Sequence, residues 1–316
     1  MSNLMPSPDA LECRADAASA PSVKAYRARS ADLGGGFVVR RALPQTGRRL
    51  VGPWCFLDHF GPLSFNAGKP MDVAPHPHIG LQTVTWLVEG EALHKDSLGH
   101  EQLIRPGQLN LMTAGRGIAH SEETPPRNSG ALHGLQLWLA LPDAHRHAAP
   151  SFHHHGRLPM VTFGTCRAMV VIGELDGVRS PAQTYSSTVG VELAADRDGH
   201  TAVPLAASFE HAILLLVGHV ELDDRALAPG TLYYLSTGRE QLSLRLRAGA
   251  RLMLIGGEPF GERILMWWNF VARTPEEIAE ARSDWEQDHR RFGDVRAYVG
   301  RRLPAPPLTL RPPRPG

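Results

Sequence analysis

The apolar residues of this chain fall in short runs that are separated by glycine, proline and polar turn residues. The run "TVTWLVEGE" (residues 83–91) combines β-branched and aromatic side chains and then breaks at Gly90, which is typical of a strand that enters a turn. The runs "QLNLMT" (108–113) and "HGLQLWLALP" (133–142) follow the same pattern. Because 31 glycines and 26 prolines also favour short strands joined by tight turns, we predict an all-β protein.

One β-unit occurs twice along the chain. Residues 211–236 can be aligned with residues 83–113, so that Gly218 matches Gly90 and Pro229-Gly230 matches Pro106-Gly107. Each copy then reads as an apolar strand, a turn, a polar hairpin and a second apolar strand. Matching offsets of this kind indicate duplicated β-domains.

A polar, histidine-rich segment divides the two copies. Residues 143–159, "DAHRHAAPSFHHHGRLP", are bounded by prolines and predict a linker in which His153, His154 and His155 form a solvated loop. We therefore expect a first domain over residues 24–145 and a second over residues 146–316. Residues 1–23 lack periodicity and predict a disordered extension.

The clearest helix signal lies near the end of the second domain. Thr274 as N-cap, Pro275 at the first helical position and Glu277 two residues later form a capping box, which predicts a helix over about residues 274–291. A proline-rich tail follows the helix. The residues expected on its packed face are Ile278, Ala281 and Trp285.

Composition excludes several classes of partner. The net charge of +1 over 316 residues provides no field that would gather nucleic acid or an anionic membrane surface. The three cysteines, Cys13, Cys55 and Cys166, are odd in number and widely spaced, so we expect neither a disulfide framework nor a thiolate zinc site. Because the sequence also shows no signal peptide and no long apolar span, we expect a cytoplasmic protein.

HxH spacing occurs three times, at His76/His78, His145/His147 and His153/His155, but only the first pair lies beside a β-run with a matching HxE pair elsewhere in the same half. His76 and His78 in "PHPHIG" are two residues apart, so on a strand both imidazoles project from one face. His120 and Glu122 in "GIAHSEE" have the same spacing after another β-run. If the two segments meet inside a barrel, they offer three imidazoles and one carboxylate to one cation.

The donor set narrows the choice of metal. Three histidines and one glutamate without a thiolate suit Fe(II), Ni(II), Mn(II) or Cu(II), with positions left open for a substrate or dioxygen. His219 and Glu221 repeat the HxE spacing in the second half, but no HxH precedes them, so no second metal site is expected. His94 and His100 flank the hairpin "HKDSLGH" and are expected to form hydrogen bonds within it.

The ordered motifs of the first half resemble those of the pirin family, a branch of the cupin superfamily. They are "FLDHFGP", "HPHIGLQTVTWLVEGE", "HKDSLGH", "PGQLNLMTAGRGIAHSE" and "HGLQLWLALP", and "GGEPFGERI" with "WWNFV" is similar to the pirin C-terminal domain. The resemblance implies a bicupin of two antiparallel β-barrel or jelly-roll domains with metal only in the first. The family's ligand positions fall on His76, His78, His120 and Glu122.

The resemblance also implies a function. It points to a mononuclear metal-dependent dioxygenase, a quercetinase that cleaves a quercetin-type flavonol or a similar enol with O2, and to one Fe(II) per chain, with Ni, Mn, Cu or Zn as alternatives. Glu122 would be the catalytic base, and His59 and Gln82 would lie in the pocket or behind the ligands. The alternative is an iron-binding, redox-sensing protein that binds a transcription factor or a metabolic enzyme without turnover.

Overall fold

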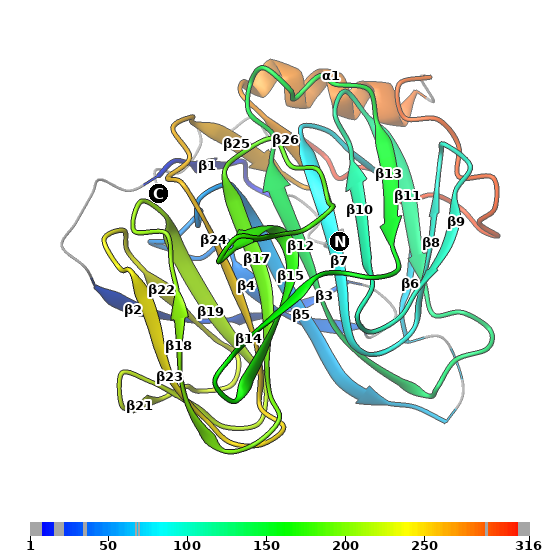
Figure 1. The fold of residues 1–316 in the computed structure, drawn as a ribbon. Coiled ribbons are helices and arrows are strands. Elements are labelled where there is room, and N and C mark those ends of the chain that lie inside the picture. Colours follow the sequence, from blue (N-terminus) through cyan, green and yellow to red (C-terminus); the bar gives the residue numbers. More distant parts are fainter. Residues whose placement is uncertain are drawn as a thin grey trace.

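The computed structural model describes residues 8–15, 22–33, 37–66, 68, 70–287 and 290–308. Within this part of the chain the structure consists of antiparallel strands and one helix (Figure 1), which confirms the all-β prediction. None of its helices is long and apolar enough to cross a membrane.

The first half folds into a large sheet and a small sheet. The large sheet has the strand order β13-β10-β7-β12-β5-β4-β3, and the small sheet has the order β6-β11-β8-β9. The strands are β3 (Arg29–Asp32), β4 (Val38–Leu43), β5 (Trp54–Ser64), β6 (Asp72–His78), β7 (Leu81–Gly90), β8 (Ala92–Asp96), β9 (Glu101–Ile104), β10 (Leu109–Thr113), β11 (Ile118–Glu123), β12 (Ala131–Ala140) and β13 (Ser151–His155).

The second half repeats this arrangement. Its large sheet has the order β14-β15-β17-β24-β19-β22-β2, with β16 paired to β15, and its small sheet has the order β18-β23-β20-β21. The strands are β2 (Val23–Arg27), β14 (Met160–Phe163), β15 (Cys166–Leu175), β16 (Val178–Arg179), β17 (Thr188–Ala195), β18 (Gly199–Pro204), β19 (Glu210–Val217), β20 (Val220–Leu222), β21 (Arg225–Ala226), β22 (Thr231–Leu235), β23 (Gln241–Leu246) and β24 (Arg251–Gly257).

The two halves exchange strands at their edges. β13, from the segment expected to be a linker, pairs with β10 of the first large sheet, and β2 pairs with β22 of the second. His153–His155 therefore lie in a strand, and the prediction of a solvated loop is wrong. The sequence pattern missed this strand because its pairing partner lies about 40 residues away and its own side chains are polar.

The two large sheets pack against each other across a shared apolar core. Val84, Trp86 and Leu135 of the first sheet contribute to the same buried cluster as Leu214 and Met253 of the second. The inner face of each large sheet covers its own small sheet and closes a barrel around a separate core. Alternate residues on β7 and β12 therefore face either the first barrel or the second domain.

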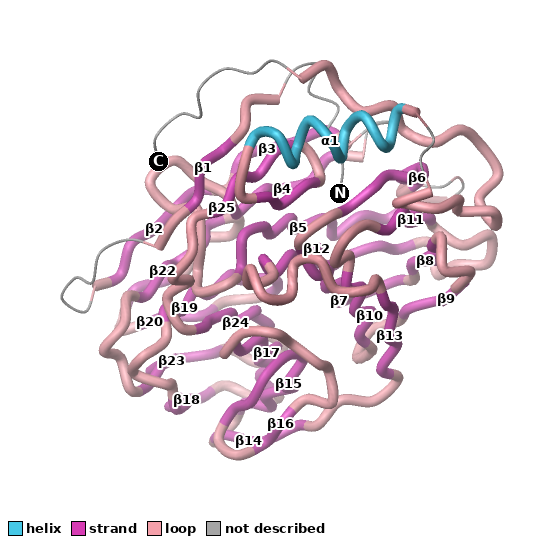
Figure 2. Tube along the Cα trace, turned by 90° about the horizontal axis from the view of Figure 1, so that it is seen from above, coloured by secondary structure: helices cyan, strands magenta, loops and turns pink. Residues whose placement is uncertain are grey.

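The end of the chain covers the outside of the first small sheet, β6-β11-β8-β9. β25 (Ile264–Trp267) pairs with β26 (Phe270–Ala272) and with β1 (Leu11–Cys13), and α1 (Pro275–Glu286) follows. β1 contradicts the expected disorder at residues 11–13, whereas residues 1–7 and 16–21 lie outside the described residues. Viewed from above, α1 crosses the top of the molecule (Figure 2).

Thr274 caps α1 as predicted, because its side chain accepts a hydrogen bond from the Glu277 amide. The packed face is also confirmed, since Ile278, Ala281 and Trp285 are buried. The helix ends at Glu286, so its predicted extension to residue 291 is wrong, although residues 288 and 289 are not described. Of the proline-rich tail, residues 309–316 lie outside the described residues.

Candidate metal centre

Two neighbouring strands of the small sheet carry the residues singled out by spacing. His76 and His78 lie on β6, and His120 and Glu122 lie on the adjacent β11. The register pairs His120 with His76, and it shifts between His120 and Glu122. Because side chains alternate along a strand, all four point to the inner side of the sheet, toward the first large sheet.

The three histidines form a compact group. One ring nitrogen from each of His76, His78 and His120 lies within 4.8 Å of the others. Their side chains are buried, with 0%, 0% and 1% exposure. Distances of this size allow three imidazoles to share one metal ion.

Each of the four residues has one buried atom without a hydrogen-bond partner in the described structure. These atoms are the Nε2 atoms of His76, His78 and His120 and the Oε2 atom of Glu122. Burying a polar atom without a partner is costly, and buried polar groups are normally satisfied. A cation bound by the three Nε2 atoms would satisfy them together, so the histidines fit a metal ion. Glu122 is not part of the group of donor atoms that lie within 4.8 Å of one another, so its role as a fourth ligand stays a prediction.

Burial also prepares the imidazoles for metal binding. Removal from water lowers the pKa of His76 to about 3 and lowers the pKa values of His78 and His120 well below the usual histidine value. Neighbouring histidines lower the values of His78 and His120 further. The three rings are therefore neutral at pH 7, as a metal requires of its histidine ligands.

Backbone carbonyls fix the orientation of two of the rings. His76 Nδ1 lies 2.9 Å from the carbonyl oxygen of Ala74, and His78 Nδ1 lies 3.0 Å from that of Asn269. Since a carbonyl only accepts, each Nδ1 carries the hydrogen and each Nε2 keeps its lone pair. His120 differs, because its Nδ1 lies 3.4 Å from Nδ1 of His94, another side chain.

Glu122 is held by residues that spacing did not single out. The Thr85 hydroxyl lies 3.1 Å from Glu122 Oε1 and 3.0 Å from Gln136 Oε1. Burial raises the pKa of Glu122, so in the absence of a metal its carboxyl group is shifted toward the protonated form. A metal at this site would oppose that shift by favouring the carboxylate.

The polar contacts continue across the inner face of the large sheet. Thr85, Gln136, Asp58 and Arg41 are successive cross-strand partners on β7, β12, β5 and β4. Arg41 donates two hydrogen bonds to Asp58, of 2.8 and 2.7 Å, in a buried pair. One sequence signal could have drawn attention to Gln136, since it is a single amide inside the apolar run 135–141.

The two expected pocket residues do not join the histidine group. His59 shares a face with Leu57 and pairs with Leu135, both in the core between the domains, and its Nε2 lies 2.7 Å from Nε2 of His133. Gln82 donates to Thr113 and to the carbonyl of Gln183, a residue of the second domain. Both residues therefore support the interface between the domains.

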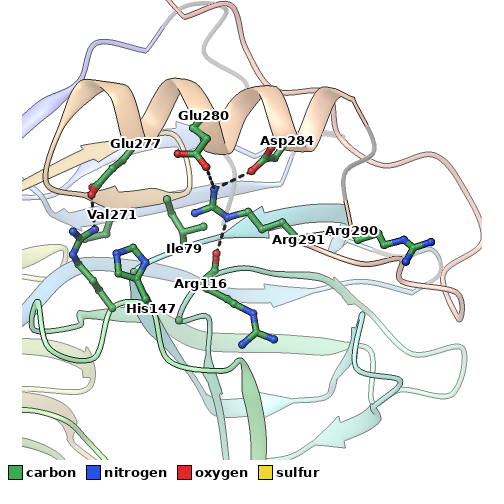
Figure 3. A pocket seen from close by; sticks show the side chains of 12 residues that line it. Ile79, Arg116, His147, Val271, Glu277, Glu280, Asp284, Arg290 and Arg291 are labelled. Atoms are coloured by element: carbon green, nitrogen blue, oxygen red, sulfur yellow. Dashed lines mark hydrogen bonds and ion pairs between the residues drawn. The ribbon is translucent and has the colours of Figure 1, made fainter.

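A surface cavity of about 500 Å³ lies under α1 (Figure 3), but its lining includes none of the four candidate ligands. Its charged groups are largely occupied by one another. Arg291 lies 2.9 Å from Asp284 and 3.8 Å from Glu280, and it donates to the carbonyl of Arg116 over 2.7 Å. We therefore assign the chemistry to the histidine group.

Comparison with known proteins agrees with this fold. Residues 36–139 match the Pirin family, and residues 190–293 match the Pirin C-terminal cupin domain. The chain belongs to the pirin family. The bicupin fold predicted from the sequence is thereby confirmed, and the four candidate ligands lie in the first of the two matched regions.

Two relatives share nearly the whole chain. A Pseudomonas aeruginosa protein provisionally named quercetin 2,3-dioxygenase is 48% identical over 281 residues, which cover 89% of each protein. A pirin-like protein of Caulobacter vibrioides is 39% identical over 277 residues, covering 85% of this chain and 95% of the relative. The crystal structure of a quercetin 2,3-dioxygenase from Acinetobacter baumannii has 45% identity and a TM-score of 0.89, covering 92% of this chain and 96% of that one.

Proposed function

We propose that this pirin is a mononuclear metal-dependent dioxygenase that cleaves a quercetin-type flavonol or a similar enol with O2. The observation that carries the proposal is the group of three buried histidines, His76, His78 and His120, whose Nε2 atoms have no hydrogen-bond partner in the described structure. The names of the two quercetin 2,3-dioxygenase relatives, at 48% and 45% identity, support this substrate class. The reaction would add both atoms of dioxygen to the flavonol and release carbon monoxide.

We assign Fe(II) to the site, with Ni, Mn, Cu or Zn as alternatives. The Nε2 atoms of the three histidines and Oε2 of Glu122 would hold the ion, and nitrogen and oxygen donors without a thiolate suit this group of metals. When bound, a redox-active ion of this kind supplies the electron exchange that a flavonol needs in order to react with dioxygen.

Glu122 is the residue that we propose as general base. It is the one acidic residue among the four proposed ligands, so its carboxylate is the natural acceptor for the proton of a substrate hydroxyl. Thr85 holds the Oε1 atom of Glu122 and thereby fixes the plane of the carboxyl group. The surrounding apolar residues, among them Trp138 against His78, exclude water from the proton transfer.

A second candidate function is favoured by the burial of the site. Because the three histidines are at most 1% exposed, a molecule as large as a flavonol must displace protein atoms before it reaches them. An enclosed ion suits a redox sensor whose oxidation state changes a surface that binds a protein partner. Such a protein would hold the metal without turning over a flavonol.

A spectroscopic assay in air separates the two functions. The metal-free protein is loaded in parallel with Fe(II), Ni(II), Mn(II) and Cu(II) and mixed with quercetin, and the flavonol absorbance is followed. We expect at least one metal to give steady loss of absorbance with release of carbon monoxide. A complete lack of loss with all four metals, at one bound ion per chain, would favour the sensor.

A further inference from the structure

We infer that His94 and Asp96 are positioning residues that orient His120 and strengthen it as a metal ligand. They act through a series of hydrogen bonds that reaches the surface at His100. This inference rests on the proposed metal site. It assigns a role to the hairpin "HKDSLGH" that goes beyond the internal hydrogen bonds expected from its sequence.

A metal bound to Nε2 of His120 would fix the direction of each hydrogen bond in this series. If Nε2 of His120 gives its lone pair to a metal, the ring hydrogen lies on Nδ1 and is donated to His94 Nδ1, 3.4 Å away. The hydrogen of a neutral His94 then lies on Nε2, which faces Asp96 Oδ2 at 3.1 Å. Each donor therefore meets an acceptor, and the series of hydrogen bonds ends at the Asp96 carboxylate.

Asp96 is built to remain a carboxylate. Its side chain is buried, and its Oδ1 accepts hydrogen bonds from the backbone amides of Leu98, at 2.9 Å, and His100, at 3.1 Å. Burial by itself would raise the pKa of Asp96, but the hydrogen bond from His94 and the contacts with His100 lower it overall. The Asp96 end of the hydrogen-bond series is thus negatively charged.

The ring plane of His94 is also fixed by packing. Phe152 of β13 stacks on it, with the ring centroids 4.2 Å apart and the planes 8° from parallel. Beyond Asp96, the imidazole of His100 lies 3.0 Å from the carboxylate with its side chain 43% exposed. The series of hydrogen bonds therefore runs from the buried His120, through the buried side chains of His94 and Asp96, to the partly exposed His100.

The other two histidines of the group have no such connection. His76 and His78 donate to backbone carbonyls, which are neutral. A carboxylate behind a histidine increases the basicity of that ligand, and loss of such a partner typically lowers metal affinity 10- to 100-fold. Among the contacts of the described residues, His120 is thus the one imidazole of the three whose hydrogen bonds lead to a charged group, and through it the protein would tune the affinity for a metal.

The test is Asp96→Asn, measured with Co(II) as the probe. Asn keeps an oxygen for the two backbone amides but places an NH2 group against Nε2 of His94. Two donors then face each other, so the series of hydrogen bonds is interrupted at this point. We expect the Co(II) dissociation constant, obtained by competition with a chelator, to rise about 10- to 100-fold, and the visible Co(II) bands to shift. His94→Phe, which keeps the stacked ring but removes both nitrogens, should act in the same direction.

His100→Asn is the matched control, because His100 contacts the same carboxylate from the solvent side. We expect its Co(II) affinity to stay within about twofold of wild type, since the bonds from Asp96 to His120 remain. Unchanged affinity and spectrum in Asp96→Asn would overturn the inference. An equal loss in His100→Asn would also overturn it, because hairpin stability would then be the cause.

This test does not depend on the proposed dioxygenase activity. If wild-type protein binds Co(II) and the Asp96→Asn effect appears, the inference stands even when no flavonol is cleaved. If wild-type protein binds no Co(II), the metal site itself is refuted, and both the inference and the proposed function fail with it.

Discussion

At the scale of single residues, Glu122 separates metal binding from catalysis. Glu122→Gln removes the proposed base but leaves all three imidazoles, so we expect turnover of a flavonol to fall by about 10²-fold or more while the metal content changes much less. Initial rates normalised to bound metal measure this. Thr85→Val, which keeps the carboxyl group but removes the hydroxyl that contacts Glu122 and Gln136, should give a smaller loss. Wild-type rates in Glu122→Gln would refute the base assignment.

The His59–His133 pair makes a pH-dependent contribution to stability. Burial lowers the pKa of His59 to about 3 and that of His133 to about 4, from 6.5, with the nearby Arg40 guanidinium adding to both shifts. The unfolded chain therefore binds more protons, and stability is lost as the pH falls from 6.5 toward these values. In His59→Gln, the slope of unfolding free energy against pH between 4.5 and 6 should decrease by about 1.4 kcal/mol per unit. An unchanged slope would contradict this account.

Among the residues at the site, those that lie close to one another in the sequence could be predicted. His76 with His78, and His120 with Glu122, share a face because of two-residue spacing on a strand, which is a local property. His94, Thr85 and Gln136 reach the site through the register of strands far apart in the chain, which one sequence does not specify. His59 and Gln82 have the right residue types but lie on the other face of their strands.

At the scale of elements, the capping box of α1 was predictable because all its members lie within five residues. The Thr274 side chain accepts from the Glu277 amide at 3.3 Å, while the Glu277 side chain accepts from the Arg273 amide at 2.8 Å. We expect Thr274→Ala to lower the free energy of unfolding by about 1 kcal/mol, measured by urea denaturation. Thr274→Ser keeps the hydroxyl and should retain most of the stability; equal losses in both variants would exclude capping as the cause.

The strand exchange was not predictable, for an equally physical reason. β2 and β13 are short, partly exposed edge strands whose membership of a sheet depends on which partner strand is free to pair. Their pairing with β22 and β10 links each half of the chain to the sheet of the other half. The alignment of the two β-units therefore identified the duplication but not these crossing connections.

At the scale of the whole molecule, the shared core predicts that both domains unfold together. Trp86 of the first sheet donates a 2.6 Å hydrogen bond to Glu192 of the second, and both residues are buried. In Trp86→Phe, loss of this hydrogen bond should lower the free energy of unfolding by about 1–3 kcal/mol, in addition to the effect of the smaller ring. We expect urea to unfold both domains in a single transition. Trp138→Phe is the control, because the buried Trp138 indole nitrogen has no hydrogen-bond partner among the residues that the structure describes. Two separate transitions would contradict a shared core.

We propose that one ion, held by His76, His78, His120 and Glu122, makes this pirin a flavonol dioxygenase. The most direct measurement is oxygen consumption with quercetin as metal-free protein is titrated with Fe(II). We expect no oxygen consumption without metal, a linear rise up to one ion per protein chain, and no further rise beyond it. Full occupancy of the site without oxygen consumption would contradict the claim.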